Sequence, residues 1–194
     1  AAVAFAEQTD SLAAQVVFNE PVQAETVTPE AFRFDDATVT QTALRADSIA
    51  ELTLSAPPLA STVTVTGVRD LVGNRLDEIT PRFARRPTPG ALVVNEILFD
   101  PQADDFDNRP NQVEYVELYS LADHPLTLNG LTLTDRPTEA NVADTIQAGR
   151  WRVLSPGTYA VVAAAPEGAA DASQSQLATA FPEAPLATDS VAYL

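Results

Sequence analysis

The 194-residue sequence contains no cysteine, no methionine and no lysine. The lack of cysteine excludes disulfide bonds and thiolate chemistry, although it leaves the cellular compartment open. There is one histidine, so any histidine-based metal site or catalytic triad has to use His124. No apolar run approaches the ~18 residues of a membrane-spanning helix, so the sequence predicts no membrane insertion.

Positive charge is scarce, because the 11 basic residues, all arginines, oppose 27 acidic residues and leave a net charge of −16. Such a surface repels nucleic-acid phosphates and anionic membranes, so the sequence predicts no nucleic-acid partner. It attracts divalent cations or basic partners. The chain also lacks an initial methionine and a signal peptide, which indicates a segment of a longer polypeptide.

Short runs rich in threonine and valine, broken by proline, asparagine and aspartate, predict an all-β fold. Alternating apolar residues predict strands at Gln15–Phe18, Glu51–Leu54 and Val63–Val68, and Phe32 and Phe34 are expected to point inward. Thr28-Pro29-Glu30 predicts one helical turn. Asp70–Asn74 predicts a tight turn in which Asp70 binds local amides and Gly73 takes a positive φ.

The second half of the chain continues this pattern after a predicted linker at 84–90, which contains two prolines and two arginines. Strands are predicted at Leu92–Phe99, Glu114–Leu121 and Tyr159–Ala163, and Ser155-Pro156-Gly157 predicts a turn before the last of them. In the first of these strands, strict alternation places Val94, Glu96 and Leu98 on one face.

Three segments of the first half, Phe18–Val22, Thr28–Phe32 and Thr64–Leu76, resemble the bacterial Ig-like domain of S-layer and other surface proteins. In the second half, NEI at Asn95–Ile97 and EYVEL at Glu114–Leu118 resemble the bacterial lamin-tail domain. The resemblance implies two Ig-like β-sandwich domains in tandem, at residues 1–83 and 91–194. It also implies that Leu186–Leu194 is the penultimate strand and that a final strand is absent.

The lamin-tail resemblance changes one expectation. Turn statistics alone predict an Asn-Gly hairpin at the TLNGLT segment, residues 127–132. The corresponding segment of lamin-tail domains crosses between sheets instead, and we follow that prediction because the apolar stretch before the turn is short.

Three groups of residues are candidates for chemistry. The first is an acidic loop whose oxygen ligands suit Ca²⁺, although its spacing departs from the EF-hand pattern and a solvated loop is the alternative. Its residues are Asp100, Asp104, Asp105, Asp107 and Asn108.

The second group is Glu96, Glu114 and Glu117, which lie on adjacent predicted strands. They could act as the paired carboxylates of a hydrolase, but we favour a structural role in which they bind loop amides or linker arginines. The lamin-tail resemblance assigns them no catalytic role.

The third group surrounds His124, with Ser120 and Asp123 nearby in sequence. Neighbouring loop residues seldom form a catalytic triad, so an exposed turn histidine is expected. The single tryptophan, Trp151, either forms a binding platform for a sugar or a peptide or packs on the sheet, and packing is favoured.

The sequence therefore predicts a non-enzymatic structural or spacer segment of a larger secreted or cell-surface bacterial protein, with no cofactor other than a candidate Ca²⁺. The expected partners are other domains of the same polypeptide. The alternative is a binding or adhesion module, Ca²⁺-dependent or attached to a secreted hydrolase or nuclease, with a protein or glycan partner at the cell surface. An enzyme in its own right is disfavoured because no motif supplies the site geometry.

Overall fold

The computed structural model describes residues 1–98, 114–134, 144–146, 153–163 and 191–193. These residues form strands, turns and two short 3₁₀ turns, and no α-helix occurs among them, so the predicted all-β class is confirmed. None of their helical segments is long and apolar enough to cross a bilayer. The chain divides into two compact units, Ala1–Arg86 and Pro87–Leu194. The predicted domains at 1–83 and 91–194 and the linker at 84–90 stay predictions.

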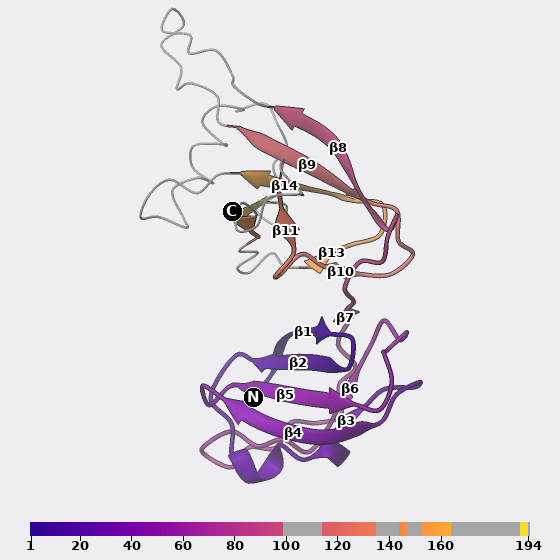
Figure 1. The fold of residues 1–194 in the computed structure, drawn as a ribbon. Helices are drawn as coiled ribbons and strands as arrows, with labels where there is room; N and C mark the ends of the chain where they lie inside the picture. The colour runs from indigo at the N-terminus through magenta and orange to yellow at the C-terminus, as the bar shows by residue number, and fades with distance from the viewer. Residues whose placement is uncertain (99–113, 135–143, 147–152, 164–190, 194) are drawn as a thin grey trace, which may run out of the picture. The chain divides into compact units, whose positions relative to one another are not determined.

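The first unit contains a five-stranded sheet of order β4-β5-β2-β1-β7 and a two-stranded sheet of β3 and β6 (Figure 1). Neighbouring strands are antiparallel except for β1 and β7, which are parallel. The strands are β1 (Val3–Asp10), β2 (Ala13–Phe18), β3 (Phe32–Arg33), β4 (Val39–Arg45), β5 (Ile49–Leu54), β6 (Thr64–Val65) and β7 (Phe83–Ala84). Two 3₁₀ turns, Ala24–Thr26 and Pro29–Ala31, precede β3, and the second is the predicted turn after Thr28.

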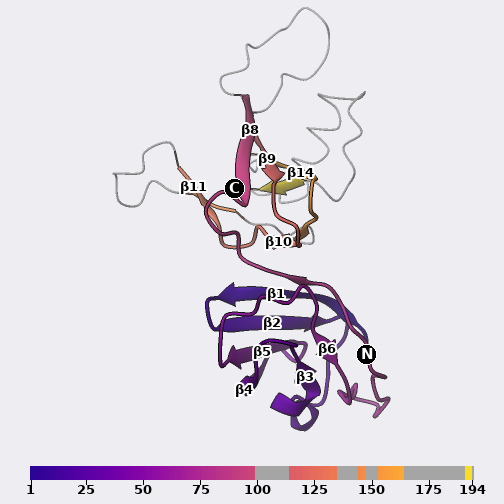
Figure 2. The same ribbon diagram turned by 90° about the vertical axis from the view of Figure 1, so that its right-hand side faces the viewer.

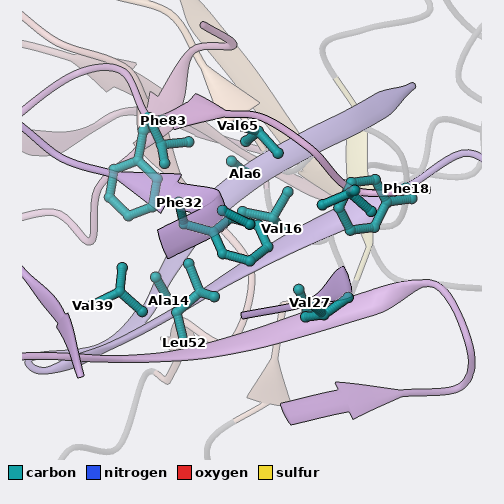
Figure 3. Packing of buried hydrophobic residues seen from close by; sticks show 14 of the residues in the cluster. Ala6, Ala14, Val16, Phe18, Val27, Phe32, Val39, Leu52, Val65 and Phe83 are labelled. Atoms are coloured by element: carbon teal, nitrogen blue, oxygen red, sulfur yellow. The ribbon is translucent and has the colours of Figure 1, made fainter. Parts of the chain in front are cut away.

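The apolar core of the first unit lies between its two sheets. Val16 and Leu52 of the larger sheet and Phe32 and Val65 of the smaller one point toward one another (Figure 3). The rings of Phe34 and Phe83 meet edge to face with their centroids 5.0 Å apart. Each fully buried side chain of this size stabilises the fold by roughly 1.5–3 kcal/mol.

The predicted turn at Asp70–Asn74 has the expected hydrogen bonds. The Asp70 carboxylate accepts from the amides of Val72 and Asn74 and from the side chain of Asn74, at 2.8–3.0 Å. Gly73 has φ of 91°, a conformation that other residues rarely adopt. Burial acts to raise the pKa of Asp70, but the hydrogen bonds from Asn74 and Val72 outweigh it and hold the pKa below its ordinary value.

The turn between β4 and β5 contains backbone strain that glycine usually relieves. Ala46 and Asp47 have φ of 49° and 57°, and both carry a Cβ that disfavours the left-handed region. The turn is held nonetheless, because the carbonyl oxygens of Asp47 and Ser48 accept hydrogen bonds from Val22 and Phe18.

Ala46→Gly is therefore expected to stabilise the first unit by about 0.5–1 kcal/mol, the relief of strain less the extra freedom of the unfolded chain. Urea unfolding measures this change. Ala43→Gly is the matched control, because Ala43 is an exposed residue of β4 and glycine within a strand destabilises it. Equal effects of the two substitutions on the free energy of unfolding would show that the left-handed conformation of Ala46 does not destabilise the first unit.

The second unit contains a four-stranded sheet of order β15-β14-β9-β8 and two two-stranded sheets, β10-β13 and β11-β12. Figure 2 shows β8, β9 and β14 of the larger sheet and β10 and β11 of the smaller ones. In the larger sheet β8, β9 and β14 pair antiparallel, whereas β15 pairs parallel with β14. The strands are β8 (Leu92–Leu98), β9 (Tyr115–Ser120), β10 (Leu126–Thr127), β11 (Thr132–Leu133), β12 (Asp144–Thr145), β13 (Val153–Leu154), β14 (Tyr159–Ala163) and β15 (Val191–Tyr193).

A second apolar cluster forms where the four-stranded sheet meets the smaller sheets. Its buried members are Leu118, Leu126, Leu128, Ile146, Leu154, Ala160 and Val162. The Asn129-Gly130 turn connects β10 to β11, which belong to different sheets, so the prediction of a crossing rather than a hairpin is confirmed. The predicted turn before β14 is also present, with Thr158 N–H donating to the Ser155 carbonyl.

The predicted alternation along β8 is wrong, because the register shifts between Val94 and Glu96 and leaves Asn95 as an extra residue. Val94 pairs with Leu118 and Ile97 with Val116, so Val94 and Ile97 share the face that carries the core. Glu96 pairs with Glu117 on the opposite face. The bulge therefore separates Val94 from Glu96, which strict alternation placed together.

Candidate functional site

Two carboxylates face each other on the outer surface of β8 and β9. Glu96 and Glu117 are direct cross-strand partners, and Glu96 is exposed. Within the part of the chain that the structure describes, neither has an arginine partner. Like charges directly opposite each other destabilise a sheet, so other groups have to offset their repulsion.

Those groups are the side chains of Asn95 and Tyr115. Asn95 Nδ2 donates to Glu117 Oε1 and the Tyr115 hydroxyl donates to Glu96 Oε1, both at 2.7 Å. These two hydrogen bonds come from side chains on β8 and β9, whereas we expected loop amides or linker arginines as the donors. Glu114 is exposed and lies just before β9.

The hydrogen bond to Glu96 also makes the Tyr115 hydroxyl harder to ionise. That bond, the burial of the phenol and the charges of Glu96 and Glu117 together raise the pKa of Tyr115 to about 12. The neutral phenol is the form that the site stabilises. Its contribution to stability is therefore complete below the ordinary tyrosine pKa of about 10 and is lost as the pH rises from there to about 12.

An alkaline absorbance titration should thus show one of the four tyrosines ionising near pH 12. Tyr115→Phe should remove this step and lower the free energy of unfolding at neutral pH by about 1 kcal/mol, the cost of one hydrogen bond. Tyr119→Phe is the control and should retain the step. Persistence of the step in Tyr115→Phe would assign it to another residue.

A pair of aromatic rings lies beside the carboxylates. Tyr119 and Tyr159 are cross-strand partners on β9 and β14, with ring centroids 4.6 Å apart and planes inclined by 40°. Tyr159 is exposed. Tyr119 shares its face with Glu117, two residues away on β9, so the outer surface presents phenol rings next to negative charge.

The residues around His124 do not form a triad. His124 Nδ1 lies 2.7 Å from Asp123 Oδ1, but the buried Ser120 Oγ has no hydrogen-bond partner. A nucleophilic serine needs a base within hydrogen-bond reach, and this one has none. The expectation of an exposed histidine is also wrong, because the His124 side chain is only 12% exposed, whereas that of Asp123 is 98% exposed.

Two other candidates fall outside the described residues. The acidic loop, with Asp100, Asp104, Asp105, Asp107 and Asn108, lies in the segment 99–113, and Trp151 lies in the segment 147–152. The Ca²⁺ site and the packing of the tryptophan therefore stay predictions. Among the described residues, no three histidine, cysteine, aspartate or glutamate side chains gather as metal ligands.

The described site combines negative charge with aromatic rings. It offers two carboxylates held by neutral donors, with tyrosine rings beside them, which suits a positively charged group. The sequence indicated Glu96 and Glu117 through the NEI and EYVEL motifs. It gave no sign that Asn95 and Tyr115 would bind them, because those contacts depend on the register between two distant strands.

No protein-family model matches the sequence, and no curated protein matches it. The fold is similar to the N-terminal part of the bacterial S-layer protein SbsC, at 22% identity and a TM-score of 0.40, over 48% of this chain and 26% of that one. It is also similar to domains 1–6 of surface layer protein SbsC, at 16% identity and a TM-score of 0.40, over 83% of this chain and 32% of that one. The chain spans about a third or less of the length of these structures.

Proposed function

We propose that this chain is a non-catalytic structural spacer within a larger secreted or cell-surface bacterial protein. A spacer has to transmit tension along the polypeptide without unfolding, so the arrangement of its outermost strands matters more than any reactive group. The observation that carries the proposal is the parallel pairing of the first and last strands of the first unit.

The strands β1 and β7 lie side by side and run in the same direction, with Ala6 paired to Phe83 and Glu7 to Ala84. The contact continues past β7. The Arg86 amide donates to Gln8 Oε1 at 3.0 Å, and the Arg86 guanidinium donates to the Thr9 carbonyl at 3.2 Å. Residues 83–86 are thus bound along residues 6–9 by main-chain pairing and by two further hydrogen bonds.

This geometry resists tension. A pull on the start of β1 and on the end of β7 draws two parallel strands in opposite directions along their length. The hydrogen bonds between them are then loaded together, and they must break at nearly the same time. Where two strands are instead pulled apart from the same end, their bonds break one after another and at lower force.

Single-molecule force measurements on the full chain test the proposal. The absence of cysteine allows a unique attachment point at Leu12→Cys, in the exposed turn after β1. We expect the first unit to unfold at higher force when the chain is pulled from its two ends than when it is pulled from Leu12→Cys and the C-terminus. The second geometry separates β1 and β7 from one end.

A substitution at the contact gives a second readout. Gln8→Ala removes the acceptor of the Arg86 amide and should lower the end-to-end unfolding force by raising the unfolding rate. Gln41→Ala, an exposed glutamine of β4, is the matched control and should leave the force unchanged. Equal forces in the two pulling geometries would contradict a spacer that acts through β1 and β7.

We infer further that the first unit is a bacterial Ig-like domain and the second a lamin-tail domain, located outside the cell. The support is the resemblance of Phe18–Val22, Thr28–Phe32 and Thr64–Leu76 to the first family and of Asn95–Ile97 and Glu114–Leu118 to the second. Sequencing of the whole gene tests this inference, since a surface anchor or further repeats of the same kind should flank the segment.

A further inference from the structure

The strand β8 lies at one edge of the four-stranded sheet of the second unit. Its only strand neighbour among the described residues is β9. Within the described part of the chain, no strand pairs with the backbone groups on its other side, and such an edge is a template for an added polypeptide segment. One face of β8 is apolar and the other is acidic, and each face determines which side chains an added strand needs on that side.

The core-side face of β8 is apolar and incompletely covered. Val94 and Ile97 are 50% and 58% exposed, whereas Leu118, the partner of Val94 on β9, is buried. The apolar surface thus continues from β9 onto β8, but its burial stops at β9. A strand added beside β8 would cover these two side chains with apolar residues of its own.

The outer face of the same strand is acidic. Glu96 opposes Glu117, and the groups that hold them, Asn95 and Tyr115, are uncharged. The Tyr119 ring shares this face. Lysine or arginine side chains of an added strand would neutralise both carboxylates and lie near an aromatic ring.

This charge also disfavours a second copy of the chain. In antiparallel self-pairing centred on β8, the carboxylates of one copy would approach the same carboxylates of the other. The bulge at Asn95 further limits a flat edge-to-edge fit. The edge therefore discriminates by charge, excluding its own copy and accepting a cationic strand.

We propose that β8 is a docking edge for an extended basic polypeptide segment that alternates lysine or arginine with aliphatic residues. The segment adds as a further strand, its aliphatic side chains cover Val94 and Ile97, and its cationic side chains meet Glu96 and Glu117. The inference goes beyond the spacer role, since it assigns a partner and depends on the second unit alone.

The experiment uses the full chain and a synthetic peptide of the length of β8, seven residues, that alternates lysine and valine. Binding is followed by titration calorimetry and by ¹⁵N chemical shifts. We expect binding that weakens with added salt, with the largest shift changes at residues 92–98. A peptide with glutamate in place of lysine should bind at least about tenfold more weakly.

Paired substitutions locate the site. Glu96→Gln with Glu117→Gln should weaken peptide binding about tenfold, because it removes both charges without changing the size of the side chains. Glu25→Gln with Glu78→Gln makes the same charge change at exposed residues of the first unit and should leave binding unchanged. A lysine–valine peptide with every second amide methylated should also bind more weakly, because it cannot form one row of strand hydrogen bonds.

Several results would overturn the proposal. These are equal binding of the lysine and glutamate peptides, equal effects of the two paired substitutions, or shift changes remote from residues 92–98. Self-association of the free chain through residues 92–98, detected by sedimentation, would show that the occupant is a second copy. The outcome is independent of the force measurements, which concern β1 and β7.

Discussion

Replacing Phe83 with alanine is expected to lower the free energy of unfolding of the first unit by about 3–5 kcal/mol. Phe83 is fully buried, its ring meets that of Phe34 edge to face, and its backbone belongs to β7. The substitution removes a large apolar surface and leaves a cavity that the rigid sheets can fill only in part. Because a small domain is stable by only about 5–15 kcal/mol, this loss is a large fraction of the total.

Hydrogen–deuterium exchange at the amides of β1 and β2 measures this effect within the first unit. Phe83→Leu should cost less, since most of the volume remains. Leu59→Ala is the control, because Leu59 is exposed and its truncation should change the free energy by less than about 0.5 kcal/mol. A loss below about 1 kcal/mol in Phe83→Ala would mean that the ring is not part of a packed core.

The second large effect is expected in the other unit, where Leu126→Ala should cost about 2–5 kcal/mol. Leu126 is fully buried on β10 and belongs to the cluster that includes Leu118 and Leu154. Its truncation removes contacts with both the larger sheet and β13, so the packing of the larger sheet against the β10-β13 sheet should be destabilised.

Leu121→Ala is a close control, since it is the same substitution five positions earlier at an exposed leucine, and it should be almost neutral. Hydrogen–deuterium exchange at the amides of β9 and β14 measures the change in the free energy of unfolding of the second unit. If the two variants lost equal stability, the assignment of Leu126 to the core would be wrong. Exchange in β1 and β2 shows at the same time whether the first unit responds.

Local rules predicted much of the fold. Gln15–Phe18 and Glu51–Leu54 lie within β2 and β5, and Phe32 and Phe34 are buried as expected. The turn at Asp70–Asn74 followed from side chains that bind their own backbone. Such features depend on a few neighbouring residues, so the sequence contains all that is needed to find them.

Other elements lacked a local signal. β4 ends at a turn formed by Ala46 and Asp47, which contains no glycine, so no turn motif marked it. The predicted strand at Val63–Val68 is shorter in the structure, because Gly67 has φ of 79° and ends the alternation before Val68, which is nevertheless buried. Here tertiary packing overrides the period-2 pattern.

In the candidate site, too, some features followed from neighbouring residues and others depended on tertiary contacts. Composition and motif indicated Glu96 and Glu117, but their direct opposition depends on one extra residue at Asn95, which no pattern in the sequence predicts. The limited exposure of His124 likewise depends on contacts made across the fold. Side-chain chemistry was thus predictable, whereas the pairing of those side chains required the register of the sheet.

The bulge at Asn95 also restricts how the length of this strand can change during evolution. Because Asn95 is the extra residue of the bulge, its loss would leave Val94, Glu96 and Ile97 as consecutive positions, with Val94 and Ile97 still on one face and Glu96 on the other. Loss of one residue elsewhere in β8 would instead reverse the two faces on one side of the deletion. Related chains should therefore accept the loss of a single residue at Asn95, whereas a change of one residue at any other position of β8 should be disfavoured.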